Sequence, residues 1–256
     1  MSRSVERVDP TVRSPFVAEH LSRYVWVSRW VADKRVLDVA CGTGYGSELL
    51  RQAGAAHVTG LDADAETIDR ARNSAGAGAI DFVHGDALSL PFADGAFDIV
   101  VSFETIEHLL DADAFVTELR RVLAIDGTLF LSTPNAKFTA RLKGPANPYH
   151  VREYTANEIR TVLSRRFPNL RLYGQRPVAG LSPCPYWELP DLGGRNWPET
   201  VAVLRWKLRR RIEGRVPDAV ARMVRRAPLY PEADQFTFDP AALETGHVIV
   251  AEGRLR

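Results

Sequence analysis

One glycine-rich stretch, residues 36–46, constrains the fold of this chain more than any other. Its sequence is VLDVACGTGYG, and its apolar start is typical of a buried parallel strand. The run ends in a turn with three glycines, and a helical pattern follows from Ser47. Glycine permits backbone angles that other residues disfavour and lets a ligand approach the main chain. A strand, a glycine turn and a helix together form a nucleotide-binding corner at the carboxyl end of a sheet.

The spacing of these glycines argues against a dinucleotide. The dinucleotide fingerprint is G-x-G-x-x-G, whose loop brings a pyrophosphate to a helix N-terminus. Here the order is Gly42-x-Gly44-x-Gly46, and Asp38 precedes it, where a carboxylate would repel a pyrophosphate but suits a cation. The stretch resembles the first motif of class I S-adenosylmethionine (SAM) methyltransferases, which is close to V-L-D-x-x-C-G-x-G. SAM carries an amino group and a sulfonium and no phosphate. The alternative is a glycine turn without a ligand.

Length and composition set wide limits. The 256 residues suffice for one α/β domain with a sizeable core, and the net charge of +1 excludes no class of partner. Cys41 and Cys184 are far apart and follow no metal-binding spacing, which predicts a reducing, cytoplasmic location. The first residues lack the apolar core of a signal peptide, and no run approaches the length of a membrane span.

Apolar runs that alternate with helical patterns predict a parallel, doubly wound α/β sheet. Further strands are expected at 57–61, 80–84, 97–103, 127–133, 170–174 and 247–251, with a helix over 16–31 that covers the sheet. Thr155 and Glu158 predict a capping box at the start of another helix. The resemblance implies the Rossmann-like seven-stranded sheet of class I methyltransferases, in which the last strands form an antiparallel hairpin.

The segment 181–240 interrupts this pattern before the last strand. Its first part is rich in proline and aromatic residues, and its second part has nine Lys or Arg residues over 205–226 against Glu213 and Asp218. We expect a SAM-binding core with an N-terminal lid helix (1–180), a helical substrate cap (181–240) and a final core strand (241–256). The basic part predicts attraction to an anionic partner such as a nucleotide-sugar, a lipid-linked glycan, a membrane surface or RNA; the alternative is a solvated helix face.

Two acids are expected at the adenosine of SAM. Asp62 stands 18 residues after Gly44, close to where such a sheet places an acid for a ribose diol. The resemblance assigns Asp86 to the adenine amino group, Ala87 to the ring face and Tyr24 to a SAM contact. The alternatives are turn capping for Asp86 and core packing for Tyr24. The full set of expected cofactor-binding residues is Tyr24, Asp38, Ala40, Cys41, Gly42, Gly44, Asp62, Ala63, Asp86, Ala87 and Phe103.

The residues that carry chemistry follow the fourth expected strand. Glu104, Glu107 and His108 stand at i, i+3 and i+4, so a helix that begins there would place them on one face. Together with His150, they could hold a divalent ion such as Mg or Mn. Alternatively, His150, His108 and Glu104 act as acid and base without a metal, or the string is only structural.

Three strings extend the resemblance. The Glu-x-x-Glu-His string is similar to metal-dependent O-methyltransferases of the ubiquinone pathway and of RNA 3′ ends. Residues 103–109, 132–135 and 147–154 together resemble bacterial methyltransferases of polysaccharide and glycolipid assembly, including the methylmannose-polysaccharide type. That resemblance implies His150 as the leading base, with Arg152 and Glu153 near the substrate.

These resemblances predict a SAM-dependent O-methyltransferase that acts on a hydroxyl of a sugar, a glycan or a polyhydroxylated small molecule. Arginines of the segment 181–240 are expected to contact a phosphate or carboxylate on that acceptor. One alternative changes the acceptor to a catechol-type natural product or to RNA, methylated at a 2′-oxygen. Another alternative is a non-catalytic binding module with the SAM fold.

Overall fold

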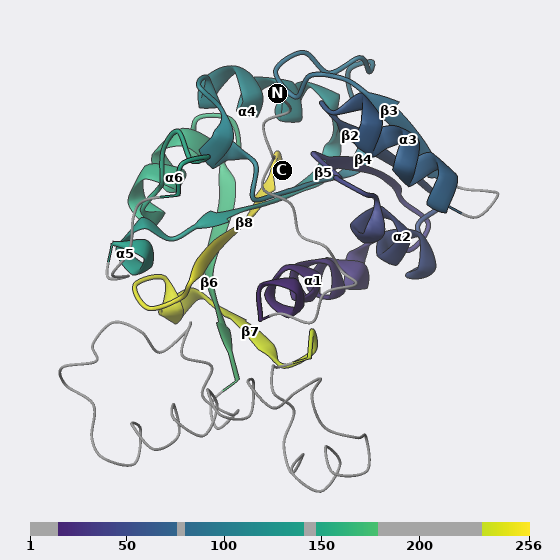
Figure 1. Cartoon of the computed structure of the whole chain (residues 1–256). Helices are drawn as coiled ribbons and strands as arrows, with labels where there is room; N and C mark the ends of the chain where they lie inside the picture. The colour runs from purple at the N-terminus through teal and green to yellow at the C-terminus, as the bar shows by residue number, and fades with distance from the viewer. Residues whose placement is uncertain (1–14, 76–79, 141–146, 179–231) are drawn as a thin grey trace, which may run out of the picture.

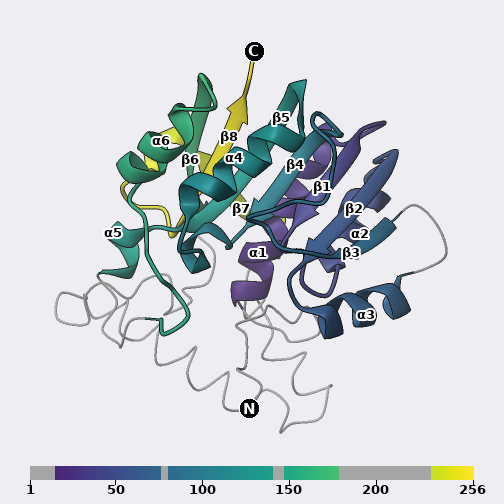
Figure 2. The same ribbon diagram turned by 90° about the horizontal axis from the view of Figure 1, so that it is seen from above.

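The computed structural model of the chain describes residues 15–75, 80–140, 147–178 and 232–256. They include one eight-stranded sheet in the order β3-β2-β1-β4-β5-β8-β6-β7 (Figure 1 and Figure 2). The strands are β1 (Arg35–Val39), β2 (His57–Asp62), β3 (Ile80–His84), β4 (Phe97–Phe103), β5 (Leu123–Pro134), β6 (Asn169–Pro177), β7 (Phe236–Asp239) and β8 (Val248–Arg254). The first five strands pair in parallel, whereas β8 is antiparallel to β5 and β6, and β7 is antiparallel to β6.

The strand order reverses beside β1. From β1 the chain passes outward through β2 to β3, and it then returns to the other side of β1 as β4. Open α/β sheets bind ligands at such a switch point, outside the carboxyl ends of the strands. The glycine turn follows β1 and the string 104–108 follows β4, so both lie at this edge.

Helices cover both faces of the sheet. They are α1 (Pro15–Val27), α2 (Tyr45–Gln52), α3 (Ala65–Ser74), α4 (Ala112–Val122), α5 (Ala136–Thr139) and α6 (Ala156–Ser164), with short 3₁₀ turns η1 (Ser28–Trp30), η2 (Ile106–His108) and η3 (Pro240–Ala242). In Figure 1 and Figure 2, α4 and α6 lie on one face of the sheet, and α1 and α2 lie on the other. This arrangement has the three layers of a doubly wound fold.

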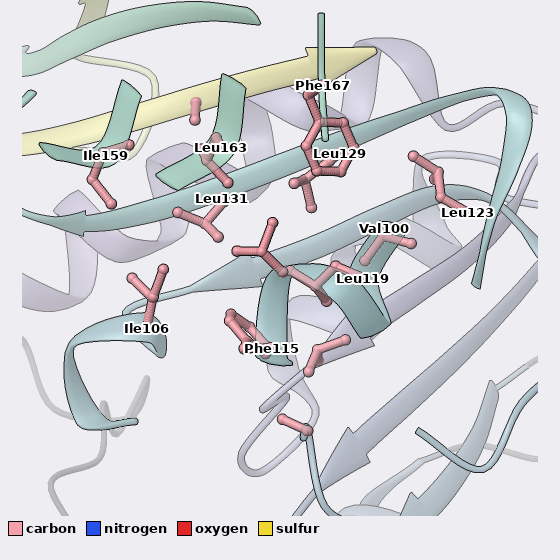
Figure 3. Close-up of a cluster of buried hydrophobic side chains, with 14 of the residues drawn as sticks. Val100, Ile106, Phe115, Leu119, Leu123, Leu129, Leu131, Ile159, Leu163 and Phe167 are labelled. Carbon is pink, nitrogen blue, oxygen red and sulfur yellow. The ribbon is translucent and has the colours of Figure 1, made fainter. Parts of the chain in front are cut away.

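Alternation along the strands divides the core into two parts. On β1, Leu37 and Val39 pack with the helices α4 and α6, whereas Val36 packs with α1 and α2. Figure 3 shows the first of these clusters, with Phe115 of α4 and Leu163 of α6. Successive strand residues point to opposite faces, so a strand buried on both faces needs apolar residues throughout. The two clusters cover the two faces of the sheet, whose edge carries the candidate site.

The structure confirms the Rossmann-like fold but has eight strands instead of seven. The parallel core, the antiparallel final strands and a helix near residues 16–31 are all present, and Thr155 forms the expected capping box with Glu158. The additional strand is β7, which pairs with β6 over Gly174–Pro177. Because β7 falls within 181–240, that segment ends in a sheet strand and is not helical throughout. Residues 179–231, with Cys184 and the basic part, lie outside the described residues, and the domain boundaries stay a prediction.

None of the helices in the described ranges is both long and apolar enough to cross a membrane. The helix α1, for example, has 13 residues. The cytoplasmic location stays a prediction from the two cysteines.

Candidate active site

The turn that follows β1 needs glycine at two positions. Gly42 and Gly44 have φ angles of +55° and +81°, in the left-handed region that favours glycine. The amide of Gly42 donates to Oδ2 of Asp62 at 2.9 Å, which joins the turn to the end of β2. Ala40 also has a positive φ, of +61°. Cys41 is buried in a small core cluster, and burial raises the pKa of its thiol. Its contact with SAM stays a prediction.

Asp38 lies buried near this turn and accepts hydrogen bonds from two hydroxyl groups. Tyr24 donates at 3.2 Å and Ser47 at 2.7 Å. Burial raises the pKa of Asp38 to about 7, and the two hydrogen bonds oppose this shift because they favour the carboxylate. A cation beside Asp38 would favour the ionised form. Tyr24 thus packs in the core and holds this acid, and its contact with SAM stays a prediction.

A cluster of four rings adjoins Asp38, and two of its members were not expected from the sequence. His20, Tyr24, Tyr45 and Phe103 pack with ring centroids 5.0–6.3 Å apart in the five recorded pairs. Nδ1 of His20 and the hydroxyl of Tyr45 lie 2.7 Å apart. Burial, and then Arg23, lowers the pKa of His20, which keeps its ring neutral. The contact between His20 and Tyr45 forms because α1 packs against α2, and no local sequence pattern predicts it.

The two acids expected at adenosine follow β2 and β3. Both carboxylate oxygens of Asp62 accept backbone amides, one of them from the glycine turn. Asp86 is exposed, and its Oδ1 accepts the amide of Leu88 at 2.9 Å, so it caps the turn as its alternative interpretation predicts. Ala87 is buried in the core and Ala63 is exposed. The contacts of these residues with adenosine remain predictions.

Glu104 does not begin a helix, and this part of the prediction is wrong. Its φ is +52°, and the turn η2 starts only at Ile106. The amide of Glu104 donates to the carbonyl of Ser132 on β5 at 3.1 Å, which prolongs the pairing of β4 with β5. Its carboxylate accepts from the Ser132 hydroxyl at 2.8 Å and lies 3.4 Å from Nη1 of Arg23. Glu104 therefore contacts α1 instead of sharing a helix face with Glu107.

The other three residues expected at a metal site do come together. Single ligand atoms of Glu107, His108 and His150 all lie within 4.8 Å of one another, and the two imidazole rings meet edge to face at 5.0 Å. Oε2 of the buried Glu107 accepts from Thr133 at 3.0 Å, whereas Oε1 finds no hydrogen-bond partner within the described ranges. Burial, and then the charge of Glu104, raises the pKa of Glu107. A proton or a cation would stabilise such an oxygen.

The second histidine comes from a separate segment, 147–154, which is fixed against η2. The carbonyl oxygen of Glu107 accepts hydrogen bonds from the backbone amides of Val151 at 2.8 Å and Arg152 at 3.1 Å. Nδ1 of His108 lies 3.0 Å from the carbonyl oxygen of Tyr149. Backbone hydrogen bonds thus hold the two histidines at one place, although 42 positions separate them in the sequence.

Arg152 and Glu153, which the resemblance places near the substrate, have different surroundings. Arg152 pairs with Glu158 at 2.7 Å, and its guanidinium lies over the ring of Tyr154. Arg152 therefore supports the start of α6. Oε1 of Glu153 lies 3.1 Å from Nδ1 of His150, so Glu153 directly contacts the candidate base.

Comparison with known families assigns the part of the chain that carries the glycine turn. Residues 37–131 match the family model of a methyltransferase domain. This stretch is a class I methyltransferase domain. It runs from β1 into β5 and includes Asp38, Asp62 and Glu107, and such a domain implies SAM as the methyl donor. His150 follows the matched stretch.

Relatives of this methyltransferase domain include proteins named for O-methylation. A probable S-adenosylmethionine-dependent methyltransferase of Mycolicibacterium smegmatis is 41% identical over 133 residues, which are 52% of this chain and 51% of that protein. A ubiquinone biosynthesis O-methyltransferase of Aromatoleum aromaticum is 36% identical over 125 residues, 47% of this chain and 53% of that protein. The chain thus spans about half the length of these curated relatives.

A solved structure shares the fold of the methyltransferase domain. A SAM-dependent methyltransferase of Thermotoga maritima, described as a possible histamine N-methyltransferase, superposes with a TM-score of 0.60 at 15% sequence identity. The match covers 94% of this chain and 92% of that protein. At this identity the likeness supports the fold alone.

Proposed function

We propose that the chain is a SAM-dependent O-methyltransferase that methylates a hydroxyl of a sugar, a glycan or another polyhydroxylated molecule. The observation that carries this proposal is the meeting of His108 and His150 at the sheet edge that also holds Asp38 and Asp62. The acids suit a cationic donor with a ribose diol, and the imidazoles suit the removal of a hydroxyl proton. The identity of the acceptor rests on the resemblance of the strings that surround these histidines.

In the proposed reaction, the acids at this edge bind the methyl donor and the histidines accept the proton. Asp62 and Asp38 bind and orient the donor, and the acceptor hydroxyl lies between the donor methyl and an imidazole. As the oxygen attacks the methyl carbon in line, the bond from sulfur to carbon breaks and the sulfonium becomes a neutral thioether. The hydroxyl proton passes to His150, with His108 as the alternative acceptor. The protein contributes alignment and charge stabilisation.

The residues present also fit a divalent ion. Oε1 of Glu107 and Nε2 of His108 and His150 are the atoms that would hold it, because Nδ1 of each ring already faces an oxygen acceptor. The side-chain amide of Asn147, which lies 3.0 Å from Nε2 of His150, would have to move away first. A bound ion would lower the pKa of a coordinated acceptor hydroxyl. Glu104, expected as a further ligand, instead contacts Ser132 and Arg23.

Chelation tests the metal-dependent form of the proposal. The metal-dependent form predicts that EDTA abolishes methyl transfer and that Mg²⁺ or Mn²⁺ restores it in the wild type, whereas the metal-free form predicts full activity in EDTA. Glu107→Gln removes a negative ligand but keeps the size of the side chain, so this variant should respond at least tenfold less to added ion. Full activity of the wild type in EDTA would refute the metal-dependent form and support the mechanism in which a histidine acts as the base without a metal.

An apolar rim favours a second candidate acceptor. Leu110, Tyr149 and Val151 are exposed, and each lies within two residues of His108 or His150. The exposed fraction of Leu110 is 90%. Such side chains suit an acceptor with an apolar part, such as a catechol-type natural-product intermediate. An RNA acceptor would instead depend on the basic residues 205–226, which lie outside the described ranges.

Incubation of the protein with radiolabelled SAM and fractionated host extracts tests the proposed function. We expect label in the glycan or polyhydroxylated fraction, and none with His150→Ala, although isothermal titration should show that this variant still binds SAM. Label only among apolar phenols or only in RNA would replace the proposed acceptor. Intact SAM binding without label in any fraction would support a non-catalytic binding module.

A further inference from the structure

Glu153 touches the candidate base and is itself held by the helix α5. Its Oε1 lies 3.1 Å from Nδ1 of His150, and its Oε2 accepts from the hydroxyl of Thr139, the last residue of α5. The N-cap of α5 is Asn135, whose side-chain amide donates to the carbonyl of Gly246 at 2.8 Å. Both oxygens of the Glu153 carboxylate thus have partners, and one partner belongs to a helix that is anchored beside β8.

A second contact determines which nitrogen of His150 carries the hydrogen. Nδ2 of Asn147 lies 3.0 Å from Nε2 of His150, and Oδ1 of Asn147 accepts the amide of Tyr149 at 3.0 Å. A backbone amide only donates, so the oxygen of Asn147 must face Tyr149 and its NH₂ group must face His150. An NH₂ group also only donates, so Nε2 of His150 is the acceptor. Nδ1 therefore carries the hydrogen and donates it to Glu153.

Nδ1 of His108 faces a different kind of group. This group is the carbonyl oxygen of Tyr149, which can accept a hydrogen bond but carries no net charge. A carboxylate accepts the same hydrogen bond and also stabilises the positive charge that the ring acquires with a second proton. Among the described residues, only His150 of this pair has a carboxylate at Nδ1. The two histidines are therefore not equivalent.

We propose that Glu153 is the positioning residue that makes Nε2 of His150, and not His108, the atom that receives the acceptor proton. This inference rests on the proposed function in its metal-free form, because an imidazole nitrogen that holds an ion cannot also accept a proton. The acceptor hydroxyl takes the place of the Asn147 amide and donates to Nε2. As the new bond from oxygen to methyl carbon forms, the O–H bond breaks and its proton stays on Nε2. Glu153 keeps the hydrogen on Nδ1 and balances the charge of the ring throughout.

Nuclear magnetic resonance of protein labelled with nitrogen-15 in its histidines reads out this orientation without any acceptor. The spectra are recorded in EDTA at about pH 8.5, where an ordinary imidazole is neutral. We expect His150 in the wild type to have hydrogen on Nδ1. Because Asn147 also donates to Nε2, the comparison is made in Asn147→Ala. There, added Glu153→Ala should shift the ring toward hydrogen on Nε2, whereas added Glu153→Gln, which keeps an acceptor oxygen, should retain hydrogen on Nδ1. The matched control is Asp126→Asn, which neutralises an exposed carboxylate near the amino end of β5 and should change nothing.

Kinetics of methyl transfer to the acceptor that the extract screen identifies supply the second readout. Glu153→Ala should lower kcat about 10- to 100-fold, with the KM for the acceptor within about twofold. The loss should stay at or below the roughly 100- to 10,000-fold that a complete general base contributes. Glu153→Gln should recover part of the lost rate. If Glu153→Ala does not fold, Thr139→Val removes the hydrogen bond to Oε2 and should lower kcat in the same direction.

Two results would overturn the inference. They are hydrogen on Nε2 of His150 in the wild type, and an unchanged hydrogen position when Glu153→Ala is added to Asn147→Ala. Either result could occur in a fully active methyltransferase, so neither would refute the proposed function. Conversely, the expected spectra in a protein that transfers no methyl group would refute the proposed function and leave the orienting contact in place.

Discussion

The charge of Asp38 depends on its surroundings, because the fold buries it without a cationic partner among its recorded hydrogen bonds. Tyr24 and Ser47 donate to it, yet burial still raises its pKa to about 7. The unfolded chain releases this proton near an ordinary Asp pKa, whereas the folded chain keeps it up to about pH 7. Its contribution to stability is therefore present below the unfolded pKa and is lost as the pH rises toward the folded pKa. A cation beside the Asp38 carboxylate would favour its ionised form.

We therefore predict that SAM binding releases a proton near neutral pH. A cation beside Asp38 favours the carboxylate, so the affinity for SAM should rise as the pH rises from about 5.5 to 7, by up to roughly tenfold per pH unit. Isothermal titration in buffers with different ionisation enthalpies measures the released proton. In Asp38→Asn, SAM binding should be weak and independent of pH in this range.

The same variant should change the stability of the protein without ligand. Asn does not ionise, so the free energy of unfolding of Asp38→Asn relative to the wild type should increase from pH 5 to pH 7. Urea denaturation at the two pH values measures this difference. A constant difference, together with pH-independent SAM binding by the wild type, would show that Asp38 is ionised in the folded protein at all these pH values.

The helix α1 is fixed to both halves of the sheet by buried polar contacts. Nη1 of Arg23 donates to Gln175 of β6 at 3.1 Å and lies 3.4 Å from Glu104. Near β8, Nδ1 of His247 lies 3.1 Å from Oε1 of Glu19, a residue of α1. Buried polar groups are costly once they lose their partners, so these contacts favour one position of α1. These contacts hold α1 against the rest of the sheet, and its expected role as a lid stays a prediction.

Gly46→Ala tests how closely α1 must approach the glycine turn. A Cβ at position 46 would overlap the ring of Tyr24, and overpacking of this kind costs about 1–3 kcal/mol. We expect a loss of unfolding free energy of that size, together with weaker SAM binding because Tyr24 must move away from Asp38. Chemical denaturation and isothermal titration measure the two effects.

Gly42→Ala is the matched comparison within the same turn. Within the described ranges, and apart from the two chain neighbours, no atom lies within 4 Å of a Cβ at position 42. The cost of this substitution therefore comes from the φ of +55° and should be about 1–2 kcal/mol. The contact between Tyr24 and Asp38 should survive in this variant. Wild-type stability of Gly46→Ala would contradict the close packing of α1.

For the whole molecule, the sequence predicts the sheet and the places of Asp38 and Asp62 better than the conformation of residues 104–108. The apolar strands and the glycine turn are local signals, so the parallel core and the places of Asp38 and Asp62 follow from them. The expected helix at Glu104 does not occur, because pairing with Ser132 and the contact with Arg23 determine the conformation there. No local pattern reports such contacts between distant segments.

Long-range contacts also explain what the sequence leaves out. His20 and Tyr45 meet only because α1 packs on α2, and Thr139 reaches Glu153 only because α5 lies beside the segment 147–154. The strand β7 was not expected because it is short and pairs with β6 over just four residues. Contacts between segments that are distant in the sequence can be identified only from the folded structure.

A crystal structure of the protein with bound SAM tests the central claim most directly. We predict that the ribose lies on Asp62, that a cationic group of SAM lies beside Asp38, and that the methyl group points toward Nε2 of His150. SAM bound at another edge of the sheet, or both His108 and His150 turned away from its sulfur, would contradict the account.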